Sequence, residues 1–313
     1  MRVLTKLGLF GLALAVVFTA ALGAGRVVGP VSAGSAAGHG SSADGAGPAG
    51  REESAGAFPK GLLVSDRGYR FAPEATVLAP GSRAEFRFTI LGAGGEPVTE
   101  YVPTHEKLLH LVVVRRDLTG FWHVHPTLGP DGVWSVPLTL PDAGGYRAFA
   151  DFQPKGAAEP LTLGADLAAP GRFAPRELPA AATTSQADGY EVELRGDLVA
   201  GKASPVTLRV SKAGRPVTDL EPYLGAYGHL VALRAGDLAY LHVHPTQGAG
   251  AKPGPEVGFA VEVPSAGQYR LFLDFQHGGQ VRTAAFTVNV AASPAREPGP
   301  ERSDTGGHDG HAD

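Results

Sequence analysis

The chain of 313 residues contains no cysteine, and its single methionine is Met1. The absence of cysteine excludes disulfides, thiolate zinc sites and a lipid anchor on cysteine, and the near absence of methionine excludes thioether sites for Cu(I). Any metal site in this chain therefore has to use imidazole and carboxylate ligands.

The sequence also lacks a block of charge of one sign. It has 27 basic and 31 acidic side chains and a formal net charge of −4. Nucleic acid is not an expected partner, because phosphate binding requires a basic patch. The chain contains no Gly-x-Ser-x-Gly, His-Glu-x-x-His or paired-acid motif, so these hydrolase and protease signatures give no indication of an enzyme.

The first part of the chain has the pattern of an export signal. Basic residues precede an uncharged apolar run, Leu7–Ala24, which small residues follow. We predict that residues 1–33 are either a cleaved signal peptide or a retained membrane anchor helix, because the run is just long enough to span a bilayer. Residues 34–57 lack large apolar side chains and are predicted to be a flexible linker. The rest of the chain is expected to be extracytoplasmic, membrane-anchored or secreted.

The body of the chain is a tandem duplication. The sequence "HLVVVRR" from His110 matches "HLVALRA" from His229, an offset of 119 residues, and "HVHPT" recurs at the same offset. We predict copy one over residues 58–168 and copy two over residues 187–291. A linker over 169–186 joins the two copies, and a disordered tail with His and Asp follows over 292–313.

Both copies have the pattern of short β-strands. In copy one Phe86, Phe88 and Ile90 alternate with polar residues, and Val206 and Leu208 do the same in copy two. The chain has 44 glycines and 26 prolines, turn signals recur along both copies, and no segment keeps a helical period. We therefore predict an all-β fold of two tandem immunoglobulin-like or cupredoxin-like β-sandwich domains behind the signal or anchor helix.

Three histidines of copy one are predicted to share one face of a β-hairpin. If the turn centres between Leu118 and Thr119, Val112 lies opposite His125 and His110 lies opposite Thr127. Side chains alternate with a period of two along a strand, so His110, His123 and His125 point the same way. The duplication predicts the same arrangement for His229, His242 and His244, with His229 opposite Thr246.

A later strand of each copy adds a carboxylate, Asp151 or Asp274, among aromatic residues. An unpaired acid buried in such a strand is costly, so it is expected to pair or to bind a metal. Neutral imidazoles with one carboxylate suit Cu(II) or Zn(II). The predicted ligand sets are His229, His242, His244, Asp274 and His277 in copy two, and His110, His123, His125 and Asp151 in copy one.

Two stretches of copy two resemble bacterial exported immunoglobulin-like domains of the YtkA-like and CopC-like kind. They are "GRPVTDLEPYLGAYGHLVALRAG" from Gly214 and "PSAGQYRLFLDFQHGGQVRTAAFTV" from Pro264. The resemblance implies the handling of copper or another heavy metal outside the cytoplasm. A second resemblance is to Cu/Zn superoxide dismutase, because "GFWHVHPT" from Gly120 is similar to the Gly-Phe-His-Val-His strand of that family. This resemblance implies a metal-dependent enzyme. The dismutase disulfide has no counterpart here, because the chain has no cysteine.

The leading hypothesis is an exported, non-enzymatic protein that binds a divalent transition metal, with copper favoured over zinc, for sequestration or delivery to a membrane metal transporter. The N-terminal segment would hold it at the membrane. The alternative is a structural or adhesive surface module without metal, in which the histidines are packing or pH-responsive groups. A dismutase-type enzyme is the third interpretation.

Overall fold

The alternating apolar pattern and the frequent turn signals produce strands throughout the part of the chain that the structure describes. The computed structural model describes residues 59–241, 243–246 and 250–291. In these ranges the regular elements are all β-strands, and no helix there is long and apolar enough to cross a membrane. The predicted signal or anchor, the first linker and the tail lie outside the described residues.

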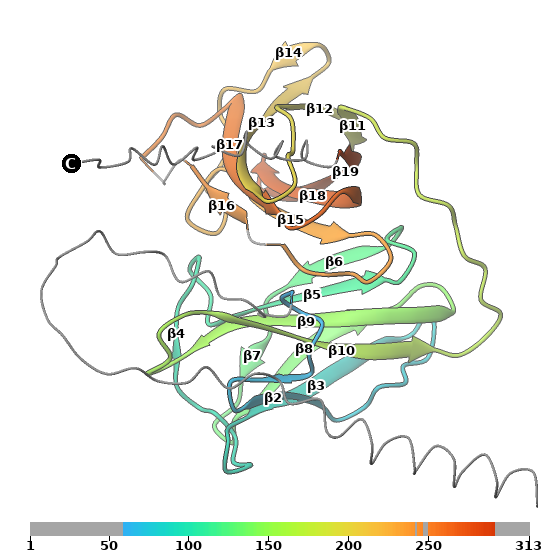
Figure 1. The fold of residues 1–313 in the computed structure, drawn as a ribbon, viewed down its shortest axis with the longest axis vertical. Coiled ribbons are helices and arrows are strands. Elements are labelled where there is room, and N and C mark those ends of the chain that lie inside the picture. Colours follow the sequence, from blue (N-terminus) through green and yellow to red (C-terminus); the bar gives the residue numbers. More distant parts are fainter. Residues whose placement is uncertain (1–58, 242, 247–249, 292–313) are drawn as a thin grey trace, which may run out of the picture. The chain divides into compact units, whose positions relative to one another are not determined.

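Copy one is a β-sandwich of two antiparallel sheets (Figure 1, blue to green). Its back sheet has the strand order β1-β2-β3-β8-β7, and its inner sheet has the order β10-β9-β5-β6, with β4 paired to β9. The strands are β1 (Ser65–Asp66), β2 (Tyr69–Pro73), β3 (Arg83–Leu91), β4 (Tyr101–Val102), β5 (Leu109–Arg115), β6 (Phe121–Val124), β7 (Thr127–Leu128), β8 (Val133–Thr139), β9 (Gly144–Pro154) and β10 (Leu161–Ala169).

Copy two is a second sandwich (Figure 1, yellow to red). Its back sheet has the order β11-β12-β13-β17-β16, with β14 paired to β13, and its inner sheet has the order β15-β18-β19. The strands are β11 (Thr184–Ala187), β12 (Tyr190–Arg195), β13 (Lys202–Lys212), β14 (Arg215–Pro216), β15 (His229–Arg234), β16 (Val243–Pro245), β17 (Glu256–Val263), β18 (Gly267–His277) and β19 (Gln280–Val290). Strand β11 begins inside the segment predicted as the second linker.

Each sandwich has its own hydrophobic core between its two sheets. The predicted inward faces are confirmed, because Phe86, Phe88 and Ile90 of β3 are fully buried in copy one. Val206 and Leu208 of β13 are equally buried in copy two. The all-β fold of two tandem immunoglobulin-like sandwiches predicted from the sequence is therefore the fold of the described chain.

A third hydrophobic cluster joins the two inner sheets. Every residue of β5 is buried, because Leu111 and Val113 face the core of copy one while Val112 and Val114 face copy two. Val112 and Val114 form one cluster with Leu118 and Phe149 of copy one and with four residues of copy two, Val231, Leu233, Leu238 and Phe272. Both sandwiches belong to one compact unit of the chain.

The hairpin of β5 and β6 differs from the predicted register by two residues. Val112 pairs with His123, whereas the sequence predicted His125 opposite Val112, so that prediction was wrong. The turn comes earlier because Asp117 accepts hydrogen bonds from the backbone N–H and the hydroxyl of Thr119, and because buried Leu118 adopts a φ of 59°. A shift of two residues keeps the predicted face, so His110 and His123 still point the same way.

The equivalent hairpin of copy two is not formed as predicted. An isolated bridge between Leu233 and Tyr240 closes the turn, but β16 then pairs with β17 in the back sheet. His244 lies opposite Ala260, and the predicted pairing of His229 with Thr246 is absent from the described residues. Leu241 still donates a hydrogen bond to Ala232 of β15, whereas β16 belongs to the back sheet, and His242 lies outside the described residues.

The third cluster predicts that Phe272→Ala destabilises the whole chain. The Phe272 ring is 3% exposed and stacks on Phe121, with ring centroids 4.1 Å apart and planes at 11°. Removing a buried phenylalanine side chain costs about 3–5 kcal/mol. Urea unfolding should show this loss, and Val281→Ala, on a side chain that is 45% exposed, should cost under about 0.5 kcal/mol. Equal effects of the two substitutions would contradict the packing of the inner sheets.

Candidate metal centre

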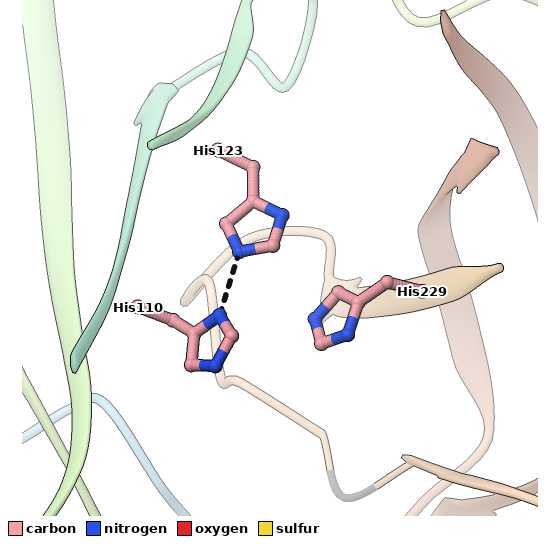
Figure 2. Close-up of side chains that lie close together, drawn as sticks. All are labelled: His110, His123 and His229. Carbon is pink, nitrogen blue, oxygen red and sulfur yellow. Dashed lines mark hydrogen bonds between the residues drawn. The ribbon is translucent and has the colours of Figure 1, made fainter. Parts of the chain in front are cut away.

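Three histidines from both copies meet beside the third hydrophobic cluster. They are His110 on β5, His123 on β6 and His229 at the start of β15 (Figure 2). One ring nitrogen of each lies within 4.8 Å of the others, and His110 is only 1% exposed. Figure 2 shows His229 approaching the two copy-one rings from the opposite side. The sequence predicted one ligand set in each copy, whereas the structure builds one cluster from both.

Two hydrogen bonds fix which nitrogens carry protons. The ring of His110 bonds through Nε2 to the carbonyl oxygen of Thr104, at 2.9 Å, and a carbonyl can only accept. The ring of His123 bonds through Nδ1 to Oδ2 of Asp274, at 2.8 Å, where the ionised carboxylate also accepts. The side chains of His123 and Asp274 are 1% and 3% exposed, so this pair is shielded from water.

The remaining nitrogens of His110 and His123 face each other. His110 Nδ1 lies 3.1 Å from His123 Nε2, which is the contact drawn as a dashed line in Figure 2. With the other two nitrogens protonated, both facing atoms offer a lone pair, and two lone pairs at this distance repel unless a cation lies between them. That cation is either a proton, which makes His123 an imidazolium paired with Asp274, or a metal ion.

Burial favours neutral imidazoles in the cluster. Loss of solvation lowers the pKa of His110 to about 4, although its hydrogen bond to Thr104 opposes the shift. Burial, followed by the neighbouring histidines, lowers the pKa of His229 well below its ordinary value. Neutral imidazole is the form that binds a metal, so burial keeps His110 and His229 in the form that can act as ligands at neutral pH.

His125 is the fourth imidazole of the site. Its ring centroid lies 5.0 Å from that of His110 and 4.9 Å from that of His123. Its Nε2 is buried and has no hydrogen-bond partner in the described chain, and burial lowers its pKa to about 3. A buried ring nitrogen without a partner is costly, and a coordinated ion would satisfy it.

The two predicted carboxylate ligands have different surroundings. In the strand registers Asp151 lies opposite His110 and Asp274 lies opposite His229. Each acid accepts a hydrogen bond from its own threonine hydroxyl, Asp151 from Thr162 and Asp274 from Thr283. Only Asp274 reaches the cluster, where it orients His123 from behind. Burial raises the pKa of Asp151, although its hydrogen bond from Thr162 opposes the shift. Asp274 is therefore a supporting residue of the kind that orients metal-binding histidines.

His277 does not join the cluster, so the predicted copy-two ligand set is wrong for this residue. Its Nδ1 lies 2.7 Å from the Tyr190 hydroxyl and its Nε2 lies 3.2 Å from Asp219 Oδ1. The physical reason is strand geometry: His277 is three residues beyond Asp274 on β18, an odd step that turns it to the other face. His244, on β16 in the back sheet, is likewise not among the three clustered ligands.

Sequence reasoning missed that the site is shared and that His105 lies beside it. The His105 ring lies 5.9 Å from the ring of His110 and 5.6 Å from that of His229. A signal for the shared site was present in "LHLVVVR" and "HLVALR", because an unbroken apolar run indicates a strand buried on both faces. Histidines on such strands have to face another layer of protein and not solvent.

The donor set fits a borderline transition metal. All its available nitrogens belong to imidazole rings, and imidazole suits zinc and copper. The carboxylate of Asp274 is hydrogen-bonded to the far nitrogen of His123. Two nitrogens bound at roughly 2.0–2.1 Å to one tetrahedral ion lie about 3.3 Å apart. The 3.1 Å between His110 and His123 is close to this value, so a modest movement of His229 would complete a three-nitrogen site.

Solved structures that resemble the chain include the adhesin FdeC of Escherichia coli, which is 17% identical over 72% of this chain and 65% of that chain, with a TM-score of 0.23. The adhesin InvE of Yersinia pseudotuberculosis is 13% identical over 71% of this chain and 59% of that chain, with a TM-score of 0.21. Domains 5 and 6 of the S-layer protein SbsC are 14% identical over 72% and 97%, at 0.22. The chain thus spans less than two thirds of the length of the two adhesin chains, and scores this low carry no information about its function.

No curated protein matches the chain. One family model matches it twice, over residues 64–166 and 184–292, with one match on each sandwich. These two segments make up more than half of the sequence, and the chain belongs to the family described as domain of unknown function DUF8832.

Proposed function

We propose that this protein binds one divalent transition-metal ion, Cu(II) in preference to Zn(II), between its two sandwiches, for sequestration or delivery outside the cytoplasm. The observation that carries the proposal is the 3.1 Å contact between Nδ1 of His110 and Nε2 of His123, whose other ring nitrogens are bonded to Thr104 and Asp274. His229 supplies the third nitrogen and His125 the fourth, while Asp274 orients His123.

The choice of copper follows from the ligands. For a given set of nitrogen and oxygen donors, affinity among the first-row divalent ions is highest for Cu(II) and lower for Zn(II). Oxygen-loving Ca²⁺ and Mg²⁺ would need several carboxylates, and Asp274 directs one oxygen to His123 and the other to Thr283. The sequence resemblance to YtkA-like and CopC-like domains supports the same assignment.

The site also suggests how binding is used. Because ligands come from both copies, a bound ion would stabilise the packing of the inner sheets as well as its own site. A buried ion held by several ligands is protected from exchange, as storage or selective delivery requires. The apolar run Leu7–Ala24 supports export, and a membrane anchor would raise the local concentration of the protein at a membrane metal transporter.

A second candidate function is a surface module without metal. The hydrogen bond between His123 and Asp274 favours it, because a proton on His123 would occupy the place of the metal and form a buried ion pair. In that case the cluster would fix the two sandwiches in a pH-dependent manner, and metal would leave the stability of the protein unchanged.

Calorimetric titration of the full chain with Cu(II) decides between these functions. We expect one tightly bound ion per chain and a large loss of affinity in His123→Ala and in His229→Ala, which lie in different copies. Asp274→Asn should weaken binding about 10–100-fold, as the loss of an orienting carboxylate does. His277→Ala is the matched control and should bind like the unaltered chain. Two ions per chain, or equal losses in His277→Ala, would contradict a single shared site.

The metal-free protein should lose stability as the pH falls below about 6.5. The pKa of His110 is about 4 in the folded chain and near 6.5 in the unfolded chain, so the unfolded chain binds more protons between these values. This contribution is fully present above pH 6.5 and disappears by pH 4, a loss of about 3 kcal/mol.

Urea unfolding at pH 7, 6 and 5 measures this dependence. His110→Gln keeps a donor near the position of Nε2 but cannot titrate, so its stability should vary less with pH over this range. His277→Gln, outside the cluster, should keep the full dependence. Identical pH profiles for His110→Gln and the unaltered chain would rule out His110 as the source.

A further inference from the structure

A pocket with both polar and apolar side chains in its wall adjoins the histidine cluster on the side of His229. It has a volume of about 110 Å³, whereas one water requires about 10–15 Å³. Its wall includes Lys60, His105, Asp151, His229, Tyr240 and His244. His110 and His123 are not part of that wall, so His229 is the ligand through which the pocket adjoins the proposed metal position.

His105 lies between this pocket and the cluster. It is exposed, unlike His110, and its ring approaches both His110 and His229 at centroid distances of 5.9 and 5.6 Å. An imidazole in this position is accessible to solvent on one side and lies next to two proposed ligands on the other.

His105 lies in a tight loop whose backbone conformation is rare for residues other than glycine. His105 and Glu106 have φ angles of 47° and 64°, in the left-handed region that side chains other than glycine rarely adopt. Two backbone hydrogen bonds between Thr104 and Lys107 close this tight loop.

At the offset of 119 residues, copy two has Leu224 and Gly225 in the same loop, with φ angles of 57° and 79°. The loop therefore forms with a leucine and a glycine, and its shape requires neither a histidine nor a glutamate. Leu224 is buried at 4% exposure, whereas His105 faces the pocket. The shape of the loop therefore does not account for a histidine at position 105, whereas the contacts of His105 with the pocket, His110 and His229 do.

We propose that this pocket is the path by which the metal ion enters and leaves, and that His105 binds the ion in transit and transfers it to His229. The inference rests on the proposed function. The hydrated ion would exchange one water for the His105 nitrogen, then further waters for His229 and His110, and finally the His105 nitrogen for His123. Each step forms one coordination bond as another breaks, and the oxidation state of the ion does not change.

The test is His105→Leu, which introduces the residue that copy two carries at this loop position. Stopped-flow absorbance would follow Cu(II) uptake by the full chain and its release to EDTA. We expect both rates to fall by about tenfold, the effect of losing one favourable contact in the transition state, with the dissociation constant almost unchanged. Glu106→Gly is the matched control: it introduces the other copy-two residue, keeps His105 and should retain the original rates.

The outcomes separate this inference from the function on which it rests. Cu(II) binding with the same uptake and release rates in His105→Leu and the unaltered chain would overturn the path alone. A loss of equilibrium affinity in His105→Leu as large as that in His229→Ala would make His105 a permanent ligand and would also overturn it. A chain that binds no Cu(II) would overturn the proposed function, and this inference with it. A thermal melt of each variant checks that the fold is retained.

Discussion

The packing of the two inner sheets against each other is the interaction on which the site depends. It buries Val112 and Val114 of copy one against Val231 and Leu233 of copy two. Since side chains alternate along a strand, the same packing places His110 next to these valines and brings His229 to it from the other copy. The hydrophobic contact thereby removes water from a group of imidazoles that no single sandwich contains.

Removal of water then determines the chemistry of the group. It lowers the pKa of His110 and His229, and it makes unpartnered nitrogens such as Nε2 of His125 costly. Thr104 and Asp274 hold the protons of the outer nitrogens, so the inner nitrogens of the pair are left as acceptors. Buried and closely spaced ring nitrogens form a site that a cation would stabilise, and this is the physical basis for proposing metal binding.

Much of the fold could be predicted from the sequence, because strand periodicity and the duplication are local or repeated signals. The inward faces of Phe86–Ile90 and the shared face of His110 and His123 follow directly from alternation. The register of the hairpin depended on one turn, where Asp117 and Leu118 set the position. The position of β16 depended on its pairing with β17, a strand that follows it in the chain. The single shared cluster depended on packing between the copies, for which the apolar runs in β5 and β15 were the available signal. The predicted role of His277 was wrong because its position on β18 turns its side chain to the other face of the strand.

The most direct measurement is X-ray diffraction from crystals of the Cu(II)-loaded chain at the copper absorption edge. A shared metal centre predicts one anomalous peak per chain, about 2 Å from His110 Nδ1, from His123 Nε2 and from a ring nitrogen of His229. A peak at His277 and Asp219, separate peaks in the two copies, or no peak near His110 would contradict a metal centre shared between the sandwiches.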